Sequence, residues 1–169
     1  IHIFTGLSGG TGAGCFLDVC YMVRDVAKDV GTVTIFGYFF LPDVNLEKIP
    51  VSDTATRAYV PQNGYAAMQE LDYCMNLQYN GGAFVQEYQN HKRIEWAEGP
   101  VDMAHLICAT DSNANVIPHA YDYAMNVTAE YLMDFLTDSQ GFDLSQQLAN
   151  FTAKVGAKDK MKNGGFNLS

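Results

Sequence analysis

The chain alternates between short apolar runs and stretches with helical periodicity. Ile1 to Thr5 and Met103 to Thr110 are short and apolar, and Thr32 to Leu41 is rich in β-branched and aromatic residues without alternation. Such runs are typical of strands that are covered on both faces. Between the strands predicted at Ile1 to Thr5 and Thr32 to Leu41, residues 15–29 carry apolar side chains at helical spacing. Gly31, a helix-ending signal, follows them.

Further helices are predicted in the rest of the chain. Thr56 to Asn76 is expected to be helical from about Gln62, and Pro118 to Leu136 predicts a long helix with proline at its start. Ser145 to Lys154 predicts another short helix. The segment from Pro42 to Asp53 is polar and is expected to form a loop.

An alternating pattern around Asn90-His91-Lys92 predicts a β-hairpin insertion at about 83–98. The order of strands and helices indicates a three-layer, Rossmann-like α/β fold with a parallel sheet. We assign residues 1–157 to one domain and 158–169 to a tail or to the start of a further segment. Few core strands are visible and Ile1 already lies in one, so the fold is expected to be incomplete at its N-terminus.

The composition indicates a globular core and argues against nucleic acid as a partner. Of the 169 residues, 48% are hydrophobic and 17% are charged, which excludes disordered and fibrous classes. Acidic residues outnumber basic ones by 19 to 10, so the net charge of −9 argues against nucleic-acid binding. No apolar run is long enough for a membrane span.

The cysteines and histidines show no metal-binding spacing. The cysteines lie in apolar segments without a CxxC pair, which predicts free thiols and a cytoplasmic location: Cys15, Cys20, Cys74 and Cys108. The histidines are scattered along the chain, so no metal site is predicted from them: His2, His91, His105 and His119.

The strongest chemical signal is a glycine-rich stretch between the first strand and the first helix. This is where open α/β sheets bind ligands. We expect residues 6–14 to form a loop whose glycines permit positive φ and close approach to an anion. Successive amides and the start of the following helix would bind phosphate, and hydroxyl donors would add to them. The candidate residues are Ser8, Gly9, Gly10, Thr11, Gly12, Ala13 and Gly14.

Commoner glycine motifs do not match. A P-loop ends in Gly-Lys-Ser/Thr, whereas Cys15 and Phe16 follow Gly14 here. The dinucleotide pattern GxGxxG, read from Gly10, requires glycine where Cys15 stands. Ser8 does not lie in a G-x-S-x-G nucleophile motif.

Residues 8–14 match the tubulin signature at every position: Ser, Ala or Gly, then GGTG, then Ser or Ala, then Gly. Over about residues 1–150 the chain therefore resembles the tubulin/FtsZ superfamily. Residues 63–71, Asn-Gly-Tyr-Ala-Ala-Met-Gln-Glu-Leu, are similar to divergent bacterial tubulin-like proteins. The resemblance implies that the loop binds the phosphates of GTP or GDP, with Mg²⁺ carried in by the nucleotide. It also implies self-association into cytoskeletal filaments.

The resemblance also implies which residues contact the guanine base. Asn113, at the carboxyl end of the third core strand, is the candidate that reads the base, with Asn115 second. Tyr121 and Asn126, in the first turns of the long helix, are candidates for stacking on the base and hydrogen bonding to it. Asp122 is the alternate at that position.

Other acidic residues are implied at the ribose and at the catalytic step. Asp43 or Glu47 is expected near the ribose. The segment around Asp143 resembles the one that supplies an acidic residue to the neighbouring subunit's nucleotide, so Asp143 is the candidate catalytic residue. Its alternative role is a helix N-cap before Ser145.

The sequence leaves three functions open. The first is a domain that binds guanine nucleotide and hydrolyses GTP only on self-assembly. The second is a degenerate tubulin-like scaffold that makes protein contacts without hydrolysis. The third is an unrelated α/β protein that uses the loop for another phosphate ligand.

Overall fold

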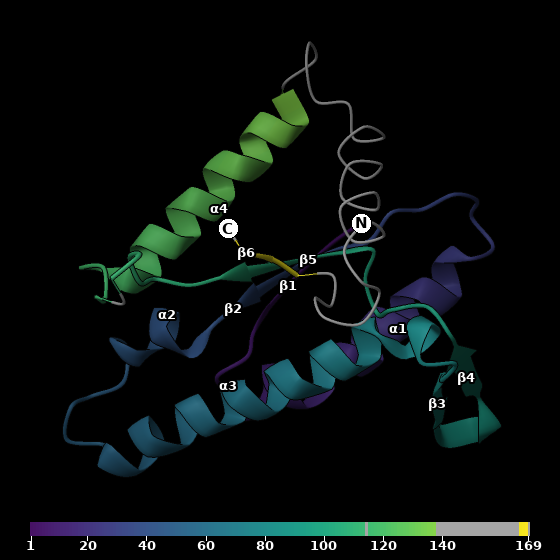
Figure 1. Cartoon of the computed structure of the whole chain (residues 1–169), viewed down its shortest axis with the longest axis horizontal. Helices are drawn as coiled ribbons and strands as arrows, with labels where there is room; N and C mark the ends of the chain where they lie inside the picture. The colour runs from purple at the N-terminus through teal and green to yellow at the C-terminus, as the bar shows by residue number, and fades with distance from the viewer. Residues whose placement is uncertain (114, 138–165, 169) are drawn as a thin grey trace.

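The computed structural model describes residues 1–113, 115–137 and 166–168 (Figure 1). Within them a parallel sheet has the strand order β1-β2-β5-β6. Its strands are β1 (His2–Gly6), β2 (Phe36–Phe40), β5 (Met103–Ile107) and β6 (Phe166–Leu168). The predicted parallel α/β sheet is thus confirmed. β6 lies in residues 158–169, which the sequence assigns to a tail or to the start of a further segment. The strand was not predicted because one this short carries no readable pattern.

Helices cover both faces of the sheet (Figure 1). α1 (Gly10–Ala27) and α3 (Thr54–Met75) lie on one face, and α4 (Ala120–Thr137) lies on the other. Every residue of β2 and β5 is buried, which explains why these strands read as continuous apolar runs rather than alternating ones.

Successive residues of β2 serve the two different cores. Phe39 packs with Phe16 of α1 and Leu71 of α3, whereas Tyr38 and Phe40 pack beneath α4. This follows from the period of two along a strand. Burial of each such side chain contributes roughly 1.5–3 kcal/mol, so the two clusters hold the helices to both faces of the sheet.

The hairpin packs against the far end of α1. β3 (Phe84–Glu87) pairs antiparallel with β4 (Arg93–Trp96). The Phe84 ring stacks on the ring of Tyr21, with centroids 3.9 Å apart. The short 3-10 helices η1 (Leu77–Tyr79) and η2 (Gln89–His91) lead into the hairpin and connect its strands.

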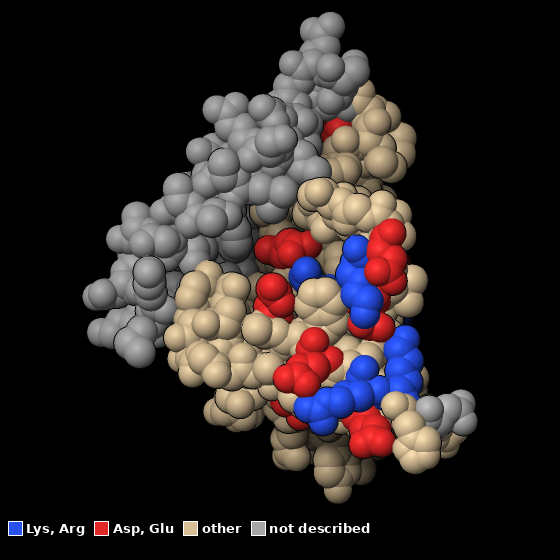
Figure 2. Space-filling model, turned by 90° about the vertical axis from the view of Figure 1, so that its right-hand side faces the viewer, with Lys and Arg blue, Asp and Glu red and all other residues tan. Residues whose placement is uncertain are grey.

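Polar contacts also hold the hairpin to α1. The Tyr88 hydroxyl donates to Asp18 at 2.5 Å, and Lys92 lies 3.2 Å from Asp25, which also accepts from Lys28 at 2.6 Å. Figure 2 shows acidic and basic side chains interleaved on this side of the molecule. The visible charged surface there is therefore mixed in sign.

α3 begins earlier than the sequence predicted. It starts at Thr54 rather than near Gln62, because Asp53 caps it by accepting a hydrogen bond from the Thr56 N–H at 3.0 Å. Pro61 therefore lies inside the helix, where it cannot donate a backbone hydrogen bond. The buried stripe of α3 compensates for that loss: Val60, Gly64, Ala67, Leu71, Cys74 and Met75.

The segment from Pro42 to Asp53 is not wholly a loop. It begins with the short helix α2 (Pro42–Leu46), whose proline occupies the first turn and whose Val44 is fully buried. Among the described residues, no helix has both the length and the apolar character needed to cross a membrane.

Candidate functional site

The candidate site lies where three parallel strands end. The Leu7 N–H donates to the carbonyl of Phe40 at 2.9 Å, and the Leu41 N–H donates to the carbonyl of Ile107 at 2.8 Å. These bonds continue the ladders past the ends of β1, β2 and β5. The segments that follow the three strands are therefore neighbours at one edge of the sheet.

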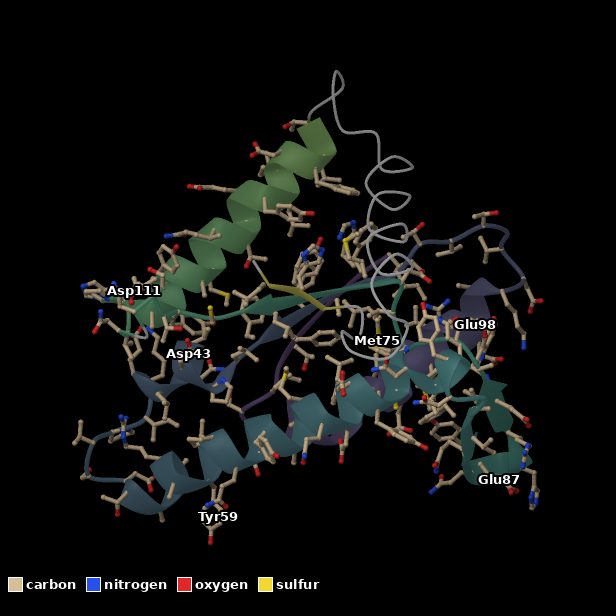
Figure 3. The ribbon with its side chains drawn as sticks, in the orientation of Figure 1. Asp43, Tyr59, Met75, Glu87, Glu98 and Asp111 are labelled. Carbon is tan, nitrogen blue, oxygen red and sulfur yellow. The ribbon has the colours of Figure 1, made fainter. Side chains whose placement is uncertain are left out.

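Side chains mark the two ends of the molecule. Asp43 and Asp111 lie at the end where β5 finishes, and Glu87 and Glu98 lie at the opposite end with the hairpin (Figure 3). The segments that follow β1, β2 and β5, which carry the glycine motif, Asp43 and Asn113, thus lie at the carboxyl end of the sheet, where open α/β folds bind ligands.

The glycine loop is shorter than predicted. α1 starts at Gly10, so the strand-to-helix loop covers only residues 7–9, and Gly14 lies within the helix. The loop glycines do not adopt the positive φ that glycine permits: among the described glycines only Gly31 and Gly81 have it. The loop can pass directly into a helix because these positions use ordinary backbone angles.

The glycines have two different steric roles. An added Cβ would meet nothing within 4 Å at Gly9, Gly10 or Gly14, so open space lies beside that backbone. At Gly12 an added Cβ would overlap the carbonyl oxygen of Gly6. Gly12 thus allows α1 to pack closely on β1, whereas Gly9 and Gly10 leave the backbone accessible to a ligand.

The amino end of α1 is open to an anion. Its N-cap, Gly9, is extended and supplies no side-chain cap, and the first turn contains no acidic residue. The Ala13 N–H makes the first intrahelical bond, to the carbonyl of Gly9 at 3.1 Å. By helix geometry, the N–H groups of residues 10–12 have no acceptor within the helix. These donors and the helix dipole favour a negative ligand.

Ser8 is held by two amide side chains that sequence reasoning missed. Its hydroxyl oxygen accepts from Asn45 Nδ2 at 2.9 Å, and its carbonyl accepts from Asn63 Nδ2 at 3.3 Å. Asn45 belongs to α2 and Asn63 to α3. Neither residue adjoins the glycine motif, so no local signal connected them with it.

A hollow of about 250 Å³ lies beside the loop. Its walls come from the first turns of α1 and the facing side of α3, and small residues dominate them. They are Gly9, Gly10, Ala13, Gly14, Asn63, Ala66, Ala67 and Glu70.

The turn after β5 is organised by Asp111. Its Oδ1 accepts from the N–H groups of Asn113 and Asn115 at 2.8 and 2.9 Å, and Oδ2 accepts from Asn115 Nδ2 at 3.1 Å. The Asn115 side chain, followed by these backbone bonds, lowers the pKa of Asp111. Asn115 is therefore engaged within the turn, while Asn113 is exposed at its surface.

Both acids expected near the ribose, Asp43 and Glu47, accept hydrogen bonds from backbone N–H groups. Asp43 accepts from the Ala109 N–H at 2.5 Å. Glu47 accepts from the N–H groups of Ala120 and Tyr121 at 3.1 and 3.0 Å and so caps α4. The sequence could not reveal this because Glu47 and α4 are far apart in the chain.

The candidates on α4 lie on different faces. Tyr121 is half-buried against the core beneath α4, and Lys48 Nζ lies 4.8 Å from its ring centroid. Asn126 is exposed, and five residues of an α-helix separate the two directions widely. Asp122 lies 3.8 Å from the same Lys48 nitrogen. The structure therefore groups Tyr121 with Lys48 and Glu47, and it does not bring Asn126 to that group.

Asp143 lies outside the described residues. Within the described part of the chain, no group of three or more His, Cys, Asp or Glu side chains is arranged to hold a metal ion.

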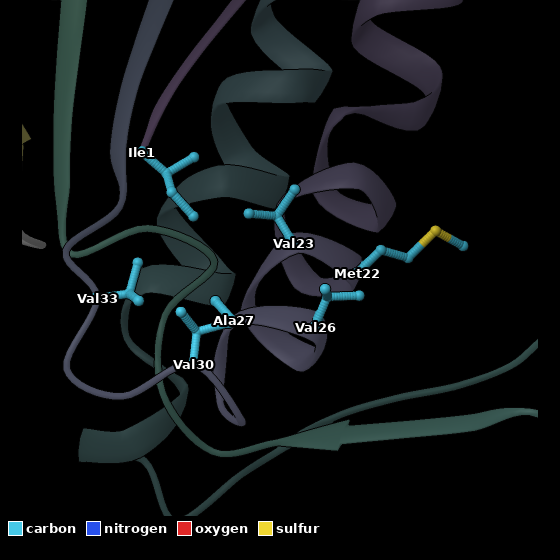
Figure 4. Close-up of a pocket in the computed structure, with 7 residues that line it drawn as sticks. All are labelled: Ile1, Met22, Val23, Val26, Ala27, Val30 and Val33. Atoms are coloured by element: carbon cyan, nitrogen blue, oxygen red, sulfur yellow. The ribbon is translucent and has the colours of Figure 1, made fainter.

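A larger cavity, of about 440 Å³, lies at the other end of α1 (Figure 4). Its lining is entirely apolar, so it offers no donor to a phosphate. The residues are Ile1, Met22, Val23, Val26, Ala27, Val30 and Val33.

Comparison with known proteins identifies a family for this chain. A protein-family model described as tubulin-like matches residues 1–169. No curated protein and no solved structure matches the chain. The glycine motif, the parallel sheet and the match over 1–169 lead to one conclusion: the chain belongs to the tubulin-like family.

Proposed function

We propose that this chain binds a guanine nucleotide, GTP or GDP, with its phosphates at the amino end of α1. The observation that carries the proposal is the uncapped start of α1, with open space beside Gly9 and Gly10. By contrast, α3 is capped by Asp53 and α4 by Glu47. Of the described long helices α1, α3 and α4, α1 alone starts without a side-chain cap, and it is the helix that contains most of the glycine motif.

The residues present suit a phosphate chain. The N–H groups at residues 10–12 supply backbone donors, and the hydroxyls of Ser8 and Thr11 add side-chain donors. The chain carries a net charge of −9, so Mg²⁺ carried by the nucleotide would offset repulsion between the phosphates and the protein. No protein cage for the metal is required.

The base would lie toward the amino end of α4. Asn113 presents an exposed amide there for the guanine edge, and Tyr121 presents a half-buried ring for stacking. Asn126 lies on a different face of α4 from Tyr121, so its part in the proposal is the smaller one.

Hydrolysis and filament formation complete the proposal. Asp143 would act on the nucleotide of a neighbouring copy, so GTP turnover would depend on self-association. We place the protein in the cytoplasm, where its cysteines, all free thiols, would remain reduced.

Equilibrium dialysis of the full-length protein with GTP, GDP and ATP tests the binding. Saturable binding of GTP and GDP, with ATP at least tenfold weaker, is expected. Equal affinity for ATP would contradict guanine recognition, and absence of all nucleotide binding would contradict the proposal as a whole.

Hydrolysis is tested by GTP turnover per molecule against protein concentration. Turnover should rise with concentration, and Asp143→Ala should abolish it while leaving GTP affinity unchanged. Nucleotide binding without turnover at any concentration would favour the alternative function, a scaffold for protein contacts.

A further inference from the structure

α2 and the residue after it contact three separate parts of the candidate site. Asp43 accepts from the backbone beyond β5, Asn45 donates to Ser8 in the glycine loop, and Glu47 caps α4. These side chains stand at alternate positions of one short segment. A single element therefore connects the phosphate end of the site to its base end.

We propose that Asn45 and Glu47 are positioning residues, of which Asn45 orients the Ser8 hydroxyl toward phosphate and Glu47 fixes the Tyr121 ring for the base. The proposal rests on the proposed nucleotide function. It assigns to Glu47 a role different from ribose contact, and to Asn45 a role that no motif indicates.

The chemistry at Asn45 follows from the direction of its hydrogen bond. Asn45 Nδ2 donates to the Ser8 oxygen at 2.9 Å, so the serine acts as acceptor in that bond. Its own O–H hydrogen remains available to donate. Ser8 is only 4% exposed, and its carbonyl accepts from Asn63 Nδ2. The hydroxyl is thus set in place before a ligand binds, which lowers the entropic cost of binding.

The chemistry at Glu47 concerns the start of α4. Its carboxylate oxygens accept from the N–H groups of Ala120 and Tyr121, which satisfies donors that would otherwise attract an anion. Phosphate is thereby directed to α1 rather than to α4. The same bonds fix the backbone of Tyr121, and Lys48 lies over its ring at 4.8 Å from the centroid.

α3 holds α2 in place through Arg57 and Gly64. The guanidinium of Arg57 donates to the carbonyls of Leu46 and Ile49 at 2.6 and 2.9 Å. Gly64 of α3 lies so close to Pro42 that a Cβ there would overlap the proline ring. Because these contacts with α3 fix α2, its side chains hold the phosphate end and the base end of the site at a constant separation.

Competition experiments separate the two ends. GTP and inorganic tripolyphosphate, which lacks the base, each displace a fluorescent GTP analogue from the full-length protein. Asn45→Ala should lower the affinity for GTP and the affinity for tripolyphosphate by a similar factor, about tenfold. Glu47→Gln, which keeps the side-chain shape but loses one acceptor, should weaken GTP about tenfold and tripolyphosphate less than twofold.

A double-mutant cycle tests whether Asn45 acts through Ser8. Ser8→Ala should lower the affinity for tripolyphosphate as much as Asn45→Ala does. The double variant should bind tripolyphosphate as tightly as either single variant. Additive losses would show that Asn45 acts by another route. The matched controls are Asn80→Ala and Glu130→Gln, both at exposed positions, which should bind like wild type.

The outcomes distinguish this inference from the proposed function. If the wild-type protein binds no GTP, the proposed function fails and this inference fails with it. If it binds GTP normally but tripolyphosphate does not compete, or if Glu47→Gln weakens both competitors equally, only the positioning roles are overturned.

Discussion

The carbonyl oxygen of Gly6 lies directly against the Cα of Gly12, so that α1 and β1 meet without a side chain between them. A Cβ at Gly12 would overlap that oxygen and lie 2.9 Å from Thr5 Oγ1. Since the overlapping atom belongs to the backbone, it cannot move aside cheaply. This contact fixes where α1 begins relative to the end of β1.

Gly12→Ala should therefore destabilise the fold by about 1–3 kcal/mol, the range for overpacking a tight contact. Urea denaturation followed by far-UV circular dichroism measures the loss. An unchanged midpoint would show that α1 can shift away from β1 without cost.

Gly10→Ala should behave in the opposite way. Nothing lies within 4 Å of the added methyl group, and alanine is a better helix former than glycine, so the melting temperature should be equal or higher. GTP affinity should fall about tenfold or more because the methyl group occupies space that the phosphates need. Undiminished GTP binding by this folded variant would place the phosphates elsewhere.

Gly64→Ala should disturb α2. The added Cβ would overlap the Pro42 ring and lie 2.8 Å from its Cδ, and a proline ring cannot rotate away. We expect a loss of about 1–3 kcal/mol in the free energy of unfolding, together with weaker GTP binding because α2 carries Asn45. Thermal unfolding with and without GTP measures both effects, and a variant with normal stability and affinity would refute the anchoring of α2.

Asp102 joins α1 to the sheet. It accepts from Arg24 at 2.9 Å and from the Ile35 N–H at 2.7 Å, and the Arg24 side chain is only 12% exposed. Asp102→Ala should cost about 2–3 kcal/mol because it leaves these donors unpaired. The matched control is Glu95→Ala: its pair with Arg93 is exposed, so urea denaturation should show almost no change.

The stability of the chain should fall in mild acid because of His105. Burial, and then the nearby charge of His2, lower the pKa of His105 below its usual 6.5. The unfolded chain therefore takes up a proton near pH 6.5 while the folded chain does not, so stability is lost as the pH falls below that value. Stability changes with pH in this direction because folding lowers the pKa of His105.

The variant His105→Phe should flatten this pH dependence. The phenyl ring can keep the stack on Tyr38, whose centroid lies 4.9 Å from that of His105. Urea unfolding at about pH 7 and about pH 5.5 should show a smaller difference for the variant than for wild type. His91→Gln, at an exposed position, should keep the wild-type difference. An equal acid loss in His105→Phe would assign the effect to other groups.

Much of the fold could be predicted because its signals are local. The buried strands β2 and β5 are continuous apolar runs, and α4 begins two residues after Pro118. Prediction of an element boundary failed where the preference of a single residue was outweighed by capping and burial. The start of α3 was placed too late because Pro61 suggests a break, whereas the Asp53 cap and the buried stripe carry the helix through it.

The sequence by itself determined the family and the place of the glycine motif, because residues 8–14 are contiguous and lead from β1 into α1. Only the tertiary structure decided which groups support that loop. Asn45 and Ser8 are 37 positions apart, and Glu47 and Tyr121 are 74 apart. A hydrogen bond over such a separation depends on how β2, α2 and α4 pack together, and packing leaves no periodic or spaced signal in the chain.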